Sequence, residues 1–301
     1  GNNEVKISFQ HPEKPHRKMS GDEQQEDTAF GLFEEPEDYF EPEKPFTFES
    51  YACVERPSRP AKSIQVRLVG SHPLWAHHLW NAAKVVSDMM DQQPPPAPMV
   101  PLDVAGKTVL ELGAGAALPS LVAAYNGAAL VVTTDYPDDD LLENIRFNIT
   151  ATFGSPPSHK ALCRGYIWGA DPSELLSLLP TPEEKEEEEE EAKSHKPGFD
   201  LIIMSDLVFN HSQHKAMLDT CLKCLSEYGV GLVAFTHHRP HLQHRDVAFL
   251  SLASEPPYCF VVEHLFDYKM KPMFAEDDGP VEVRSTVHVH SLRRKALKVT
   301  E

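Results

Sequence analysis

The stretch from Lys107 to Asp135 constrains the fold of this chain more than any other part of the sequence. It opens with a short apolar run of the kind that forms a strand buried on both faces. The tight turn Gly113-Ala114-Gly115 follows, and then come an Ala- and Leu-rich helical segment and a second apolar run that ends in Asp135. This order predicts a β-α-β unit with a glycine-rich first turn and an acid at the tip of its second strand.

The residues around this turn distinguish between two classes of nucleotide cofactor. Dinucleotide enzymes carry G-x-G-x-x-G in the turn, and the helix N-terminus receives a pyrophosphate. Here Leu118 stands where the third Gly or Ala would fall, and Glu111 precedes the turn. A carboxylate would repel a dianion, but it would attract the sulfonium and ammonium groups of S-adenosylmethionine. Asp135, about twenty residues after Gly115, can accept hydrogen bonds from ribose hydroxyls. The turn therefore predicts S-adenosylmethionine as the cofactor.

Strand and helix patterns alternate through the rest of the chain. Counting the β-α-β unit, strands are expected over 108–112, 128–134, 160–168, 199–205, 230–236, 258–266 and 283–292, and helices over 120–125, 138–148, 171–179, 214–227 and 241–253; upstream lie a strand at 64–68 and a helix at 72–91. No helix separates the last two strands, which indicates an antiparallel edge. The pattern predicts an α/β fold, a Rossmann-like seven-stranded sheet with helices on both faces and an antiparallel last strand.

Composition limits the classes of partner and compartment. The 301 residues include 28 Lys and Arg against 46 Asp and Glu, a formal charge of −18. This balance argues against direct binding to nucleic acid phosphates and suits a basic protein partner. No apolar run approaches the ~20 residues of a membrane span, and no apolar signal region opens the chain. Five scattered cysteines indicate a reducing, cytoplasmic setting. Cys221-x-x-Cys224 lies in a helical apolar pattern without a second pair, so we expect no metal.

The chain is expected to fall into two parts. Residues 1–60 are rich in Pro, Glu, Asp and Lys, which predicts a largely disordered acidic tail. Met19-Ser20-Gly21 has the form of a natural start, which would make residues 1–18 an extension. The folded domain is expected over 61–301, interrupted by a glutamate-rich insertion at 181–196 that we interpret as a solvated loop.

Ligands of open α/β sheets bind outside the carboxyl ends of the strands. Besides the glycine turn, those ends carry Asp135-Tyr136, Trp168 and Ser205-Asp206. We expect the turn glycines to let the backbone approach the methionine part of the cofactor and Asp135 to bind its ribose. Trp168 can cover the adenine, and Ser205 can contact the methionine end.

Together these motifs resemble the seven-strand protein methyltransferases related to the family-16 lysine methyltransferases. The motifs that carry the resemblance are Gly31-Leu-Phe-Glu-Glu-Pro36, Leu68-Val-Gly-Ser71, Leu74-Trp75, Leu79-Trp80-Asn81-Ala82, Val109-Leu-Glu-Leu-Gly-Ala-Gly115, Thr134-Asp-Tyr-Pro137, Trp168-Gly169 and Ser205-Asp-Leu-Val-Phe-Asn-His-Ser212. The resemblance implies a class I methyltransferase whose cofactor contacts fall on Trp80, Gly113, Ala114, Gly115, Asp135, Trp168 and Ser205, to which the strand ends add Glu111 and Tyr136. The family's usual third turn glycine is replaced by Ala117.

The resemblance also implies a substrate. Lysine-specific members of the family carry Asp-x-x-Tyr where this chain has Asp206-Leu-Val-Phe209. Loss of the hydroxyl suits an α-amine, whose pKa of ~7.7–8.0 lies well below the ~10.4 of lysine. The implied substrate is the N-terminal glycine of translation elongation factor 1A, with its adjacent lysine, bound by a monomeric enzyme. We expect Asp206 and Asn210 to orient the amine and His211 to complete the catalytic pocket.

Two alternatives stay open on the sequence. A small-molecule methyltransferase of the nicotinamide type would have a closed pocket without a peptide groove. A cofactor-binding module without catalysis would keep the fold alone, but the presence of Glu111, Asp135, Trp168 and Asp206 together argues against it.

Overall fold

The computed structural model describes residues 45–70, 76–92, 94–155, 161–180, 197–274, 276–277 and 279–295. The chain divides into two compact units, 1–42 and 43–301. The described residues all belong to the second unit. The expected start at Met19 and the acidic insertion at 181–196 lie outside the described residues.

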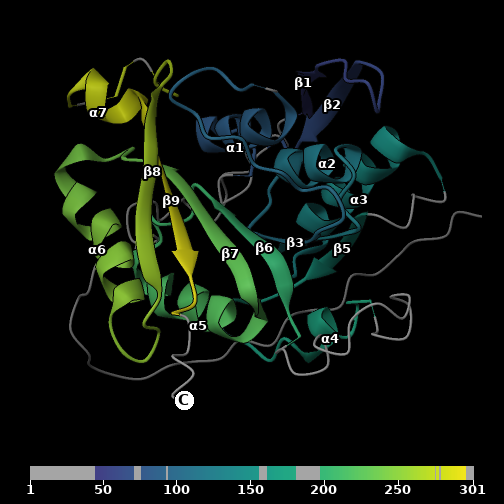
Figure 1. Cartoon of the computed structure of the whole chain (residues 1–301). Coiled ribbons are helices and arrows are strands. Elements are labelled where there is room, and N and C mark those ends of the chain that lie inside the picture. The colour runs from purple at the N-terminus through teal and green to yellow at the C-terminus, as the bar shows by residue number, and fades with distance from the viewer. Residues whose placement is uncertain are drawn as a thin grey trace, which may run out of the picture. The chain divides into compact units, whose positions relative to one another are not determined.

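The second unit is built on a seven-stranded sheet in the order β5-β4-β3-β6-β7-β9-β8 (Figure 1). The strands are β3 (Thr108–Leu112), β4 (Leu130–Asp135), β5 (Ala161–Gly165), β6 (Phe199–Ser205), β7 (Leu225–Thr236), β8 (Val261–Lys269) and β9 (Thr286–Arg293). The five strands from β5 to β7 are parallel, and β9 runs antiparallel to both of its neighbours. This order confirms the predicted sheet, including the reversed last strand.

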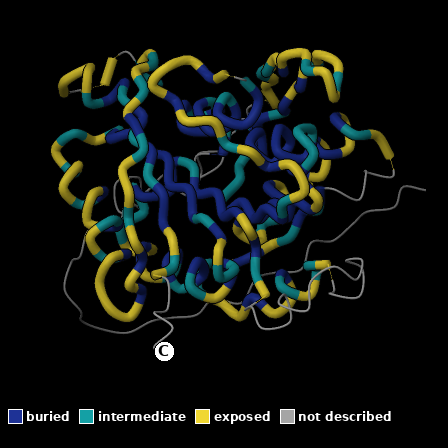
Figure 2. Tube along the Cα trace, in the orientation of Figure 1, coloured by how far each residue is buried: buried dark blue, intermediate teal, exposed yellow. Residues whose placement is uncertain are grey.

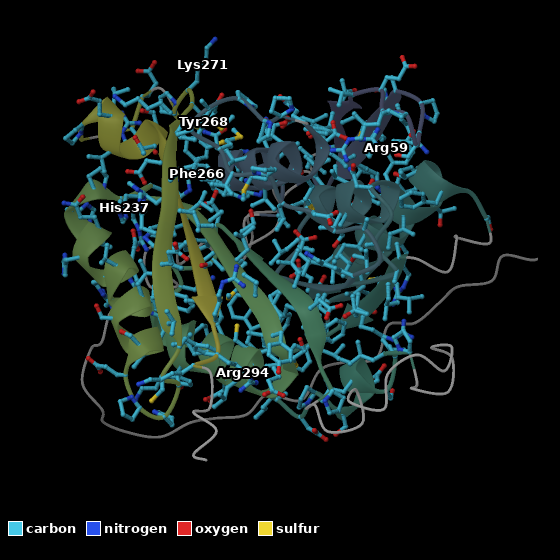
Figure 3. All side chains as sticks on the ribbon, in the orientation of Figure 1. Arg59, His237, Phe266, Tyr268, Lys271 and Arg294 are labelled. Atoms are coloured by element: carbon cyan, nitrogen blue, oxygen red, sulfur yellow. The ribbon has the colours of Figure 1, made fainter. Side chains whose placement is uncertain are left out.

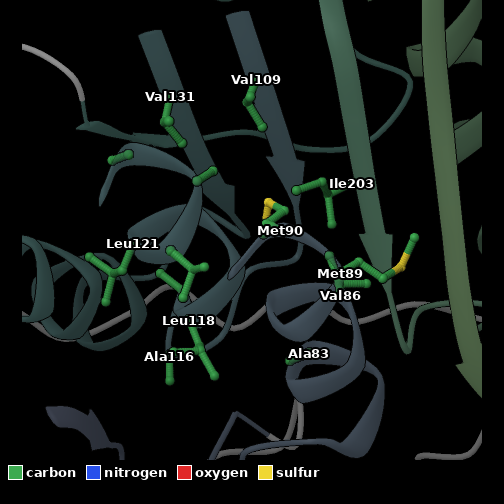
Figure 4. Close-up of a cluster of buried hydrophobic side chains, with 14 of the residues drawn as sticks. Ala83, Val86, Met89, Met90, Val109, Ala116, Leu118, Leu121, Val131 and Ile203 are labelled. Carbon is green, nitrogen blue, oxygen red and sulfur yellow. The ribbon is translucent and has the colours of Figure 1, made fainter. Parts of the chain in front are cut away.

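Helices cover both faces of the sheet because each central strand is apolar on both sides. Along β6, Leu201 and Ile203 face one core cluster, whereas Ile202 and Met204 face the other. The first cluster receives α1 (Asn81–Asp91), α2 (Leu118–Tyr125) and α3 (Asp139–Phe153), and the second receives α4 (Ser173–Leu176), α5 (His214–Cys224) and α6 (Gln243–Ser254). Figure 2 shows the buried layer that results, and Figure 4 shows the first cluster around Met90 and Leu118. None of the described helices is long and apolar enough to cross a membrane.

A two-stranded hairpin precedes α1. Its strands β1 (Thr47–Cys53) and β2 (Lys62–Leu68) are antiparallel, and alternate side chains of β2, from Ile64 to Leu68, enter the first core cluster. β1 lies within residues 1–60, so the expectation of disorder up to residue 60 is wrong over this strand. Strand β1 has little apolar pattern, because Cys53 is its one fully buried residue, and it forms through its pairing with β2.

The first helix is also shorter than expected. Its pattern predicted a start at residue 72, but α1 begins at Asn81, and Trp80 has the extended backbone of an N-cap residue (φ −68°, ψ 149°). Among 76–80, which the structure describes, no residue is helical. Asn81 instead donates a hydrogen bond from Nδ2 to the carbonyl of Lys271, 2.7 Å away. Lys271 follows β8 (Figure 3), so this bond ties the start of α1 to the loop after that strand.

Candidate active site

The turn after β3 has left-handed backbone at every second residue. Gly113, Gly115 and Ala117 have φ of 57°, 54° and 66°. Glycine adopts this conformation without the steric cost that a Cβ brings. Ala117 adopts the same conformation although it carries a Cβ. The turn thus takes the shape predicted for a backbone that approaches a ligand.

The two turn glycines meet different surroundings. A Cβ on Gly113 would lie 2.7 Å from Leu207 Cδ2 and 3.0 Å from Trp168 Cζ2, whereas a Cβ on Gly115 would meet nothing within 4 Å. Gly113 therefore makes room for protein side chains, and Gly115 faces open space. The packing also shows that the turn, Trp168 and the loop after β6 lie side by side, as their positions at strand ends predicted.

Glu111 lies beneath this turn rather than on its surface. Its side chain is fully buried, and Oε2 accepts hydrogen bonds from the backbone N (3.0 Å) and the hydroxyl of Ser120 in the first turn of α2. Burial raises the pKa of the carboxyl to about 8, with a smaller contribution from the nearby Asp135. Through these contacts Glu111 fixes the turn to α2. Its contact with the cofactor remains a prediction.

Asp135 closes the other side of the turn. Its Oδ2 accepts a hydrogen bond from the backbone N of Gly115 (2.7 Å), and its Oδ1 accepts one from that of Tyr136 (2.7 Å). Each carboxylate oxygen can accept more than one hydrogen bond. Tyr136 itself is 51% exposed. The acid at the tip of β4 therefore orients the turn directly, in the place predicted for ribose binding.

The end of β6 carries an unusual group of buried polar atoms. Asp206 has left-handed backbone (φ 53°), and its Oδ1 accepts hydrogen bonds from the backbone N of Thr236 (2.9 Å) and from His238 Nε2 (3.1 Å). Its Oδ2 is buried and has no hydrogen-bond partner among the described residues, and the same holds for the hydroxyls of Ser205 and Thr236. Buried polar atoms are nearly always hydrogen-bonded in native proteins, so this group indicates a polar ligand at the end of β6.

His211 and Asn210 differ in how they fit the prediction. His211 Nε2 lies 2.7 Å from Asp246 Oδ1, and His237 Nδ1 lies 2.7 Å from the other oxygen of the same carboxylate. His211 thus pairs with α6 and not with Asp206, and the pair of histidines joins the loop after β6 to the end of β7. Asn210, half-buried, precedes the short 3-10 helix His211–Gln213. Its role toward the amine stays a prediction.

Sequence reasoning missed His238 and the surroundings of Trp80. The Trp80 ring meets that of His238 at 4.8 Å and that of Phe274 at 6.1 Å between centroids, both edge-on, and His78 meets Phe274 at 5.1 Å. Trp80 was expected among the cofactor contacts, and the structure places it next to the partner of Asp206. The available signal was the pair His237-His238 directly after an apolar strand, at the edge where ligands bind.

Comparison with known proteins identifies the family. The Lysine methyltransferase family profile matches residues 62–178. The protein N-terminal and lysine N-methyltransferase EFM7 of Eremothecium gossypii is 41% identical over 91% of this chain and 98% of its own length. The efm7 protein of Schizosaccharomyces pombe is 38% identical over 88% of this chain and 95% of its own. The chain belongs to the EFM7 family of protein N-terminal and lysine N-methyltransferases. A putative transferase of Pyrococcus horikoshii, a solved structure, shares 15% identity over 82% of this chain and 72% of its own, with a TM-score of 0.45; the assignment rests on the sequence relatives.

This membership makes the chain an enzyme with S-adenosylmethionine as its cofactor, and it rejects the alternative of a binding module without catalysis. The residues present fit that cofactor. The turn opens outward at Gly115, the carboxylate of Asp135 stands at the tip of β4, and the buried hydroxyl of Ser205 has no hydrogen-bond partner among the described residues. Bound here, the cofactor would supply a methyl group on a sulfonium. No described group of three or more His, Cys, Asp or Glu residues could hold a metal ion.

Proposed function

We propose that this enzyme methylates the α-amine of the N-terminal glycine of translation elongation factor 1A, and the adjacent lysine, as a cytoplasmic monomer. The observation that carries the proposal is the Oδ2 atom of Asp206, a buried carboxylate oxygen without a partner among the described residues. It sits at the carboxyl end of β6, next to the loop that packs on the glycine turn. An amine N–H is a donor that such an oxygen can accept.

The chemistry asked of the protein is modest, because an amine needs only a free lone pair and an in-line approach to accept a methyl group. Positioning of this kind supplies much of the rate of a two-substrate reaction. A carboxylate oxygen that accepts a hydrogen bond from one amine N–H orients the amine, and with it the single lone pair on the nitrogen. Since an α-amine loses its proton near pH 8, it needs little help from a general base. Phe209, which replaces the tyrosine of lysine-specific relatives, adds no hydroxyl to this site.

The charge of the chain supports a basic protein as the acceptor. The formal charge of −18 favours the approach of a positively charged partner through long-range attraction. The family relatives are named for both N-terminal and lysine methylation, which supports an amine-bearing polypeptide over nicotinamide.

The test is a methylation assay with radiolabelled S-adenosylmethionine. Three acceptors are offered in parallel: elongation factor 1A, the same factor with an acetylated N-terminus, and nicotinamide. The proposal expects label on the N-terminal peptide of the first, and a loss of the α-amine product with the second. Label on nicotinamide alone would establish the small-molecule alternative.

An Asp206→Ala variant tests the role of the site in the same assay. It should lose most turnover because the amine loses its acceptor. Asp267→Ala is the matched control, because Asp267 is a half-exposed acid bonded to His264 and His288 on the sheet edge. Full turnover in Asp206→Ala would refute the assigned role.

A further inference from the structure

We propose that His238 is a positioning residue for the acceptor amine: it holds the Asp206 carboxylate so that one oxygen faces the substrate. The inference rests on the proposed function, since it concerns the same site. Its starting point is an asymmetry of that carboxylate. Oδ1 has two partners, His238 Nε2 and the backbone N of Thr236, while Oδ2 has none among the described residues.

This asymmetry has a geometric consequence. A carboxylate can rotate about its Cβ–Cγ bond, and rotation would exchange its two oxygens or turn both away from the substrate. Two hydrogen bonds to the same oxygen oppose that rotation. The Thr236 donor belongs to the backbone of β7 and is fixed by the sheet. The His238 donor belongs to a side chain, so it is the component that a substitution can remove.

His238 is itself held in place by neighbours from other segments. Its ring meets Trp80, the N-cap residue of α1, at 4.8 Å and 60° between planes. Phe274, from the loop between β8 and β9, meets the same Trp80 at 6.1 Å between ring centroids. The backbone carbonyl of Phe274 accepts a hydrogen bond from Arg284 Nη1 (2.7 Å), which anchors that loop. Trp80 therefore connects the ring that holds the carboxylate to the loop after β8.

The burial of the two partners suits this role. The side chain of Asp206 is 2% exposed and that of His238 is 16% exposed. A hydrogen bond to a charged group is worth more where water cannot replace it. Water therefore gives little competition for the bond at Asp206, and loss of the donor would free the carboxylate to rotate.

Two substitutions separate the hydrogen bond from the packing. His238→Gln keeps a nitrogen donor at about the reach of Nε2 but removes the ring. His238→Phe keeps a ring that can pack on Trp80 but removes the donor. His264→Phe is the control, because His264 is a half-exposed histidine that also bonds an aspartate, on the outer strand β8.

The assay measures kcat and KM for methylation of a panel of N-terminal peptides that includes the elongation factor 1A sequence. Binding of S-adenosylhomocysteine is measured by calorimetry on the same samples. We expect His238→Phe to lose about tenfold to hundredfold in kcat, the range set by one hydrogen bond to a charged group. His238→Gln should keep kcat within about threefold, and neither variant should change cofactor affinity or KM by as much as its kcat.

The opposite ranking, an active His238→Phe beside an inactive His238→Gln, would show that the ring matters through packing and would overturn the inference. Equal activity of His238→Phe and the wild type would overturn it as well. Failure of the proposed function has a different signature, because the wild type would then label other peptides of the panel and not the elongation factor sequence. The comparison between variants is read on whichever peptide the wild type labels.

Discussion

Gly113 and Gly115, in the turn after β3, offer a matched pair of substitutions. Gly113→Ala and Gly115→Ala both place a Cβ on left-handed backbone, at φ of 57° and 54°. That strain costs about 1–2 kcal/mol, and the lower entropy of alanine in the unfolded chain returns about 0.4–1 kcal/mol. Gly115→Ala should therefore destabilise the protein by about 1 kcal/mol, since its Cβ meets nothing within 4 Å.

Gly113→Ala carries a second cost. Its Cβ would lie 2.7 Å from Leu207 Cδ2 and 3.0 Å from Trp168 Cζ2, and overpacking of this kind costs about 1–3 kcal/mol. The expected total is about 2–4 kcal/mol. In a domain of this size, these losses of unfolding free energy correspond to a drop in Tm of roughly 5–15 °C for Gly113→Ala and roughly 2–4 °C for Gly115→Ala.

Urea unfolding without ligand measures both free energies, and calorimetry with S-adenosylhomocysteine measures cofactor affinity. Relative to the stability that each variant loses, we expect Gly115→Ala to lose more cofactor affinity than Gly113→Ala. The reason is that the Cβ at position 115 points into the open side of the turn. Combining Gly113→Ala with Leu207→Ala should reduce the cost of the glycine substitution toward that of Gly115→Ala. Equal destabilisation by the two single variants would refute the contact argument.

Three further substitutions test buried ionisable groups, and a fourth is an exposed control. The pKa of Glu111, raised to about 8 from a usual 4.5, means that the folded state holds a proton that the unfolded chain has lost; the free energy of unfolding should therefore fall between pH 5 and 8 and then level off. Glu111→Gln should flatten that slope in urea titrations at several pH values, and an unchanged slope would contradict the assignment. Asp246→Asn weakens the bridge between two histidines from neighbouring loops and should cost about 1.5–3 kcal/mol on urea unfolding. A cost below about 0.5 kcal/mol, no more than that of a surface ion pair, would show that the bridge adds nothing. Asp91→Ala removes the ion-pair partner of the buried Arg59 side chain and should cost about 3–5 kcal/mol. Glu282→Ala breaks an exposed ion pair and should cost under about 1 kcal/mol. Equal costs would refute the role of burial.

The sequence predicted the sheet well because its central strands are apolar on both faces. The apolar run from Phe199 to Ser205 predicts a buried strand, and β6 spans those residues in the structure. The strand ends that follow such runs then place their polar residues at one edge. The positions of Asp135 and Asp206 at that edge could be predicted in this way.

The partners of those residues could not be predicted, because they depend on contacts between distant segments. His211 follows Asp206 closely in the sequence, yet it pairs with Asp246 on α6. His238, 32 residues away, is the histidine that reaches the Asp206 carboxylate. Strand β1 escaped prediction for a related reason, since its side chains are mostly exposed and the backbone pairing with β2 stabilises it.

The reversed strand β9 has a consequence for the order in which the protein can be assembled. β9 lies between β7 and β8, and it is the single sheet neighbour of β8 among the described strands. During synthesis β8 leaves the ribosome first and has no edge on which to pair, because β7 must keep its own edge for β9. The two strands therefore enter the sheet together, as a hairpin that closes onto β7 late in translation. The same hairpin carries the loop with Phe274, which packs on Trp80. The packing around Trp80 is thus completed only after the strands on either side of the glycine turn have been synthesised.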